Sequence, residues 1–467
     1  MKAGAAETII TPSIGLSMKG WSNRIAGDTI ARYVHDDLFV KAICIEQENA
    51  TLCVAVLDIA GIDQPFVKAV RKAVSESVGI DSDSIMISAT HCHSNAAINP
   101  IALGYTDENM GTTSSGNVSG NWQSTEVRPA VLGENDINWE WREEIQQKTI
   151  DTIIAAWHKR EEATLSYAEQ EIEGVASSRR VHLKNGNWGD PRDDSFDKEN
   201  VDSISTIDPN IRTLFIKAKE NGKMIGVLVN YGSHPWLLSI SGYSAEISGS
   251  VASKVASAFS EENDKPIVLY TVAPLGDTTM IWNLDIENMW KSHDGESVED
   301  GVKRREAIYD KELDRLGDIM CDGVVKSYQK VIEISSNEKI ESNLKKIKLP
   351  FKDGYYHLDS IIQTEEQKSV KDAQLTEIQA FRIGGFVILG MPAEPFSSLG
   401  FKIREKTDIS SLMIIAHAND SGGFQYYATK EEYRLGGYEI TISTLKDSAG
   451  EIMVDEAVEF LKTSDSA

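Results

Sequence analysis

The sequence predicts an α/β protein with a mixed β-sheet core and flanking helices. Two β-branched apolar runs, Leu38–Glu46 and Thr51–Ile59, are joined by four residues, which is typical of a hairpin. Elsewhere an apolar run is followed by a stretch of helical spacing, such as Phe66–Val78. No internal repeat and no Pro/Ser-rich linker divides the 467 residues, so we expect residues 1–467 to form a single large domain.

The individual elements follow from the same patterns. Val67, Val70 and Val74 recur at helical spacing, and Asn221–Gly222 is a strong hairpin turn signal. The expected strands are Leu38–Glu46, Thr51–Ile59, Ser84–Ser88, Leu214–Lys217, Met224–Tyr231, Ile267–Val272, Glu377–Ile383 and Phe386–Leu389. The expected helices are Phe66–Val78, Asn138–Lys159, Ile247–Phe259, Gly301–Lys330 and Glu451–Leu461.

Two polar stretches interrupt this alternation. Residues 102–136 are dominated by Gly, Ser, Thr and Asn, and residues 185–209 are polar and acidic. Long connections of this kind are either functional lids or tolerated surface insertions, and the sequence leaves both readings open.

The net charge of −25 excludes some classes of partner, because an acidic surface repels phosphate backbones and anionic lipid headgroups. We therefore expect a small-molecule substrate, no nucleic acid and no stable membrane association, while a homo-oligomer remains compatible with the sequence.

The N-terminal segment has no apolar signal region, and no run approaches 18 apolar residues. The four cysteines form no CxxC pair, and we interpret them as reduced thiols of a cytoplasmic protein, although two bridges are an alternative.

Candidate site residues follow predicted strands. His91 and His93 come directly after Ser84–Ser88, and residues two apart in an extended chain point the same way. His234 follows Met224–Tyr231, and the carboxyl ends of strands are where ligands collect in α/β sheets. Packed or surface histidines are the alternative in both places.

A carboxylate and two tyrosines complete this set. Glu394 follows the strand Phe386–Leu389, and Tyr426 and Tyr438 flank a short predicted helix that could return both to one pocket. Two imidazoles, a carboxylate and a phenol would make a plausible Zn²⁺ shell. Glu394 could equally interact with a helix N-terminus, and the tyrosines could be core residues, so the residues alone indicate only a metal site.

Taken together, these segments resemble the neutral/alkaline (non-lysosomal) ceramidase family. The start of the chain, Ala3–Pro12, is similar to the family's AGAAxxDITPPxG opening. Thr90–Ser94 resembles the THTHSGP motif, Asn230–Pro235 the NFAxHP motif, and Met391–Glu394 the LPGE motif. Tyr426–Tyr438 is the most specific segment, and the matches run in order along nearly the entire chain.

The resemblance implies a role for each candidate. One zinc ion would be bound by His91, His234, Glu394 and Tyr426. The resemblance also implies four catalytic residues. His93 would transfer protons, and Tyr438 and Arg179 would stabilise the substrate oxyanion. Thr279 would stand in place of the family's active-site serine. Ser178 stands where the family has Asn, which leaves Arg180 as an alternative to Arg179.

The departures from the family pattern concern the substrate. The SGP part of the first motif has become Ser94-Asn95-Ala96, and no C-terminal immunoglobulin-like domain is expected after Tyr438. The sequence therefore predicts a divergent member that is a zinc-dependent hydrolase, an amidase that cleaves an amide (N-acyl) or ester bond of a small, polar substrate rather than ceramide. A lactone or ester hydrolase on the same site, or a zinc-dependent binding protein without turnover, are the alternatives.

Overall fold

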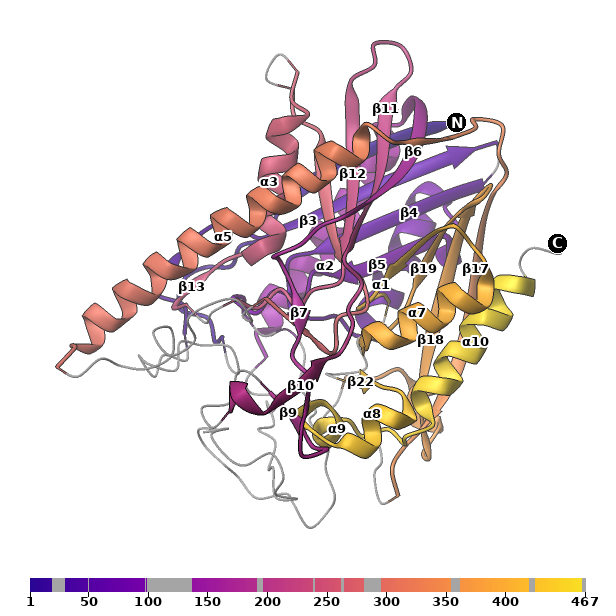
Figure 1. Cartoon of the computed structure of the whole chain (residues 1–467). Coiled ribbons are helices and arrows are strands. Elements are labelled where there is room, and N and C mark those ends of the chain that lie inside the picture. Colours follow the sequence, from indigo (N-terminus) through magenta and orange to yellow (C-terminus); the bar gives the residue numbers. More distant parts are fainter. Residues whose placement is uncertain are drawn as a thin grey trace.

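Two β-sheets pack face to face at the centre of the molecule, and helices cover the outer face of each sheet (Figure 1). The computed structural model describes residues 1–18, 30–48, 50–96, 98, 137–190, 196–237, 240–261, 264–280, 295–353, 362–419 and 425–463. The larger sheet contains β1 (Lys2–Ile9), β3 (Phe39–Gln47), β4 (Ala50–Leu57), β5 (Ile85–Ala89), β6 (Glu161–Glu171), β11 (Asn210–Ala218), β12 (Met224–Tyr231), β14 (Ile267–Val272) and β16 (Ile332–Ile334). The smaller sheet contains β17 (Ile340–Pro350), β18 (Ala373–Ile383), β19 (Phe386–Gly390) and β21 (Ser411–Ile415).

Short strands and the helices make up the rest of the fold. The short strands are β2 (Tyr33–Val34), β7 (Ser177–Ser178), β8 (Val181–Leu183), β9 (Trp188–Gly189), β10 (Val201–Ile204), β13 (Gly242–Tyr243), β15 (Thr278–Thr279), β20 (Glu394–Pro395) and β22 (Tyr426–Tyr427). The helices are α1 (Gln64–Val78), α2 (Trp139–His158), α3 (Glu246–Ala258), α5 (Val298–Tyr328), α6 (Glu365–Ser369), α7 (Ser397–Thr407), α8 (Lys430–Leu435), α9 (Tyr438–Ile442) and α10 (Ala449–Thr463). None of the helices in the described ranges is long and apolar enough to cross a bilayer.

Alternation along the central strands explains this layered arrangement. In β3, Ala42 and Cys44 face the cluster that contains α1 and α2, whereas Ile43 and Ile45 face the smaller sheet. Because successive side chains of a strand point to opposite faces, a strand buried on both sides is apolar throughout. Helices α3 and α5 cover the other half of the larger sheet, and α7 and α10 cover the smaller sheet on the opposite side of the molecule (Figure 1).

The structure confirms the predicted mixed α/β class and contains each predicted strand and helix. Helix α1 shows why the local patterns succeeded: the Asp63 carboxylate accepts a hydrogen bond from Phe66 N at 3.0 Å, and Gly79 ends the helix at φ 73°. Strands β6, β17 and β21 were not predicted. Strand β17 carries several charged and polar residues, and it is a strand because it pairs with β18 along its whole length.

The two polar stretches have different outcomes. Residues 102–136 lie outside the described residues. Within 185–209, the described part is not structureless, because β9 and β10 pair with β8 in a small three-stranded sheet. The described residues of this stretch thus contain paired strands, and its interpretation as a lid or a surface insertion stays a prediction.

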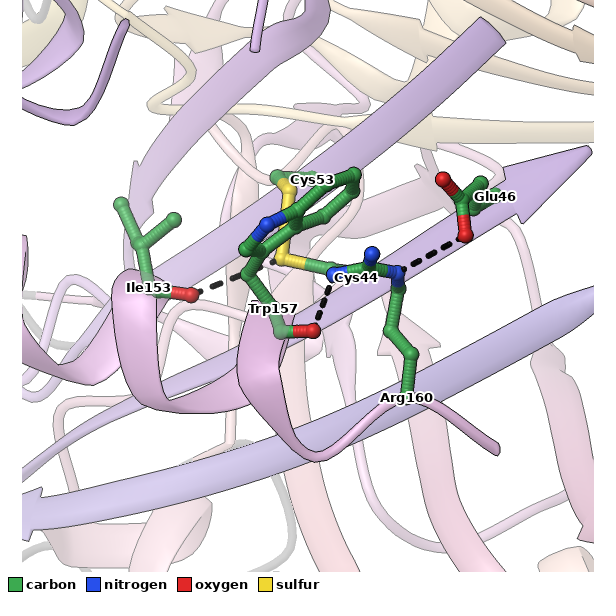
Figure 2. The surroundings of a disulfide bond; sticks show 6 residues. All are labelled: Cys44, Glu46, Cys53, Ile153, Trp157 and Arg160. Carbon is green, nitrogen blue, oxygen red and sulfur yellow. Dashed lines mark hydrogen bonds and ion pairs between the residues drawn. A yellow bond between two sulfur atoms is a disulfide. The ribbon is translucent and has the colours of Figure 1, made fainter. Parts of the chain in front are cut away.

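The interpretation of all four cysteines as reduced thiols is wrong for two of them, because Cys44 and Cys53 form a disulfide (Figure 2). The antiparallel register of β3 and β4 places them directly opposite each other, with 4.3 Å between their Cα atoms. This pairing depends on the register of the hairpin, which a cysteine count does not show. Arg160 forms an ion pair with Glu46 beside the disulfide, at 3.1 Å (Figure 2). Cys92 and Cys321 are free.

Candidate metal centre

Three parallel strand pairs bring the candidate residues together. β4 and β5, β12 and β14, and β19 and β21 are parallel, so the two strands of each pair end at the same edge. His91 follows β5, His234 follows β12, Glu394 follows β19 and His417 follows β21. The ends of both sheets therefore meet at one buried site, where all four residues are at most 5% exposed.

The imidazole of His91 is oriented by the backbone. Its Nδ1 lies 2.7 Å from the carbonyl oxygen of Ala60, which can only accept a hydrogen bond. Nδ1 therefore carries the proton, and Nε2 presents its lone pair to the site. This Nε2 lies 3.2 Å from Nε2 of His93 and 3.6 Å from Oε1 of Glu394. On the other side of the carboxylate, His234 Nδ1 lies 3.7 Å from Oε2.

Among the described residues, two groups of side chains could hold a metal ion. His91, His93 and His234 offer one ligand atom each within 4.8 Å of one another, and so do His91, Glu394 and His417. Imidazole nitrogens and a carboxylate are ligands that zinc prefers, so the donor set fits this ion. The sequence had predicted His91, His234 and Glu394 at this place, and it had given His93 a role in proton transfer rather than binding.

Burial controls the charges of these groups. It lowers the pKa of His91 to about 3 and that of His93 well below its usual value, so both imidazoles are neutral near pH 7. Burial also raises the pKa of Glu394 to about 8, although the nearby Arg179 charge lowers it. A cation at this place would favour the ionised carboxylate and would find neutral imidazoles ready to bind.

The backbone around the site adopts a conformation that residues other than glycine rarely take. His91, Ala393 and His417 have φ values of 61°, 53° and 49°. Left-handed conformations of such residues cost free energy and cluster at functional sites. Here the conformation lies directly at or next to the residues that carry the candidate ligands.

A buried carboxylate supports the loop that carries His91 and His93. Glu246, the first residue of α3, accepts a hydrogen bond from Ser94 Oγ at 2.7 Å. Ser244 N also donates to Ser94 O at 2.9 Å, which ties the same loop to the segment before α3. Burial raises the pKa of Glu246 to about 8.

The predicted tyrosines lie beside the carboxylate. Tyr426 is paired with Glu394 in the register of β20 and β22. Its ring centroid is 6.0 Å from that of Tyr438, which is half-buried at the start of α9. The guanidinium carbon of Arg179 lies 5.5 Å from the Tyr426 centroid and 5.9 Å from the Tyr438 centroid.

The two neighbouring arginines have different surroundings. Arg179 Nε donates to Glu439 Oε1 at 2.6 Å, and its Nη2 donates to the Gly276 carbonyl oxygen at 2.6 Å. Arg180 instead pairs with Glu432 at 2.6 Å and shares Glu439 at 2.9 Å. Arg179 is thus the one that contacts the two site tyrosines, and Arg180 holds α8 and α9 against β7.

Thr279 is buried in β15 opposite Ser177. The hydroxyl that reaches the His234 segment belongs to its neighbour Thr278, whose Oγ1 accepts a hydrogen bond from His234 N at 2.8 Å and donates to Leu275 O at 2.8 Å. The sequence does not single out Thr278, because Thr279 is the residue that stands in place of the family's serine.

His417 was also missed. It stands two residues after β21, the same relation that His91 has to β5. The apolar residues Leu412–Ile415 were the available signal, but the strand they form was not predicted.

Comparisons with known proteins agree with a ceramidase-like fold. No family model and no curated protein matches the chain. The crystal structure of neutral ceramidase from Pseudomonas aeruginosa is similar to 99% of this chain and 74% of that chain, with a TM-score of 0.68 and 17% identity. A structure described as ceramidase complexed with C2 is similar over 100% of this chain and 75% of that chain, with a TM-score of 0.69 and 16% identity. The predicted resemblance is thereby confirmed for the fold, and the low identity fits a divergent relative.

Proposed function

We propose that this chain is a zinc-dependent hydrolase that cleaves an amide (N-acyl) or ester bond of a small, polar molecule. The observation that supports this most is the buried meeting of His91, His234 and Glu394 beside Arg179 and Tyr438. Imidazoles and a carboxylate favour a metal ion. A cation with a phenol beside it favours a reaction in which negative charge develops on oxygen. The ceramidase-like fold adds support, since both similar structures are described as ceramidases.

The metal ligands and His93 would have different roles in the reaction. Zinc, held by His91, His234, Glu394 and Tyr426, would polarise a carbonyl group and make water more acidic. His93, neutral through burial, would accept a proton from the attacking water and return it to the leaving group.

The remaining residues would act on the substrate oxygen. The hydroxyl of the half-buried Tyr438 would donate a hydrogen bond to the carbonyl oxygen, and the Arg179 charge would stabilise the oxyanion that forms. The Thr279 hydroxyl would orient water or substrate without being acylated.

A screen of chemical classes tests this proposal against its two alternatives. Zinc-loaded and chelator-treated protein would be offered short N-acyl amides, esters, lactones and a short-chain ceramide. Zinc-dependent turnover of a small amide or ester supports the proposal, and turnover of lactones alone supports the lactonase alternative. Turnover of none by a protein that holds zinc contradicts hydrolysis and supports a binding protein.

The expectations about partners and location are part of the proposal. They are a small-molecule substrate, no nucleic acid, no stable membrane association, and a homo-oligomer as a compatible state. The cytoplasmic location loses the support that it drew from reduced cysteines, because a structural disulfide is typical of oxidising compartments.

A further inference from the structure

His417 lies at this site and has no role in the proposed reaction. It is 1% exposed, and within the described part of the chain neither Nδ1 nor Nε2 has a hydrogen-bond partner. Buried polar atoms are nearly always paired, and an unpaired one needs an explanation. Among the residues that the structure describes, both nitrogens of this imidazole are therefore unpaired.

The position of the ring suggests what pairs with it. The His417 ring stacks on that of His91, with 4.0 Å between centroids and 18° between planes. A nitrogen of His417, one of His91 and a carboxylate oxygen of Glu394 all lie within 4.8 Å of one another. Two ligand atoms that share one metal ion at about 2.0–2.2 Å are separated by no more than about 4.4 Å. Because the lone pair of an imidazole nitrogen lies in the ring plane, a rotation of the His417 ring out of the stack, together with a small closure of this group, would admit an ion.

The backbone holds His417 between the loops of the other two ligands. His417 N donates to Ala393 O at 3.1 Å, next to Glu394, and Ala89 N donates to His417 O at 3.2 Å, two residues before His91. Asn419 secures the same segment, because its side-chain oxygen accepts a hydrogen bond from Ile87 N at 3.0 Å. These bonds fix the residue against the ends of β5 and β19 despite its left-handed φ of 49°.

The two ligand groups belong to one ion rather than two. They share His91, and its Nδ1 is bound to the Ala60 carbonyl oxygen. Only Nε2 is left for a metal, and a single imidazole nitrogen binds one ion.

From this geometry we propose that His417 is a ligand of the same metal ion as His91, His234 and Glu394. The inference rests on the proposed metal-dependent function and adds a third imidazole to the ligands predicted from the sequence. Together with Tyr426, the site would offer three imidazoles, a carboxylate and a phenol, a set of nitrogen and oxygen donors that suits zinc. Such a site also accepts Co²⁺, whose visible absorption reports its ligands.

The test uses His417→Phe, which keeps an aromatic ring to stack on His91 and removes both nitrogens. The matched control is His182→Phe, a half-buried histidine far along the chain whose Nε2 contacts Ser205 Oγ at 3.2 Å. Zinc affinity is measured by competition with a chelator, and the Co²⁺-loaded proteins are compared by visible absorption. Loss of an outer partner of a ligand costs about 10–100-fold in metal affinity, so loss of a ligand should cost at least about 100-fold.

The outcomes separate the two proposals. We expect weaker zinc binding and a changed Co²⁺ spectrum for His417→Phe only. Unchanged affinity and spectrum in His417→Phe, with metal bound in the wild type, overturn the role of His417 and leave the proposed function intact. A wild type that binds no metal overturns both. X-ray absorption of the zinc-loaded wild type needs no variant to fold, and a shell with fewer than three imidazoles would also overturn the inference.

Discussion

Replacing Thr278 by valine should weaken both the fold and the metal centre. The substitution keeps the volume of the side chain and removes the hydroxyl that accepts a hydrogen bond from His234 N at 2.8 Å. Leu275 O also loses a donor, but Thr278 N still donates to it at 2.9 Å. The change therefore acts on the His234 N–H, which loses this acceptor in a segment where His234 is 5% exposed.

The expected magnitude follows from the loss of that one hydrogen bond. Removing the acceptor of a buried donor costs about 1–3 kcal/mol, so the free energy of unfolding of Thr278→Val should fall by this amount in a urea titration. Zinc affinity, measured by chelator competition, should fall as well, because the backbone of the predicted ligand His234 loses a hydrogen bond that holds it in place. Thr278→Ser should keep the zinc affinity of the wild type, since it retains the hydroxyl.

Thr213→Val is the matched control. Thr213 is fully buried in β11, and its hydroxyl has no hydrogen-bond partner among the residues that the structure describes. Its replacement should therefore be neutral or stabilising and should leave zinc affinity unchanged. Equal stability and equal zinc affinity for Thr278→Val and the wild type would refute the reasoning.

Three further predictions concern other parts of the molecule. Thr279→Ser should keep the rate on any identified substrate and Thr279→Ala should lower it about ten- to hundredfold, as expected for an orienting hydrogen bond; an acyl adduct on Thr279, detected by intact mass, would contradict this role. Burial raises the pKa of Glu246 from 4.5 to about 8, so the folded state holds this proton longer than the unfolded state, and stability is lost as the pH rises from about 4.5 through 8. Glu246→Gln should remove that part of the pH dependence of urea unfolding, and an unchanged profile would show that the carboxyl group is not its source. Thiol labelling of the unfolded, unreduced chain should modify Cys92 and Cys321 only, whereas labelling of all four cysteines would disprove the Cys44–Cys53 disulfide.

The sequence predicted the elements whose information is local. The hairpin of β3 and β4, the capped helix α1 and the apolar strand β14 all carry their pattern in their own residues. Strand β17 was missed because its charged residues resemble a surface segment, and only pairing with β18 makes it a strand.

The candidate site also has residues that the sequence indicates locally and residues that depend on distant contacts. The sequence grouped His91, His234 and Glu394 because each follows a predicted strand, and the structure brings their side chains near one another. Their role as metal ligands stays a prediction. Thr278 and His417 were not predicted because each contacts a segment that is far away in the sequence. Thr278 contacts His234 after β12, and His417 contacts His91 after β5. The disulfide was missed for a related reason, since it depends on the register between two strands.

The metal content of the purified protein tests the central claim most directly. The wild type and the variant that carries both His91→Ala and His234→Ala would be loaded with zinc, freed of excess metal and measured by elemental analysis, with circular dichroism to show that both are folded. We expect about one zinc ion per chain in the wild type and none in the double variant. Stoichiometric zinc in a folded double variant, or no zinc in the wild type, would contradict it.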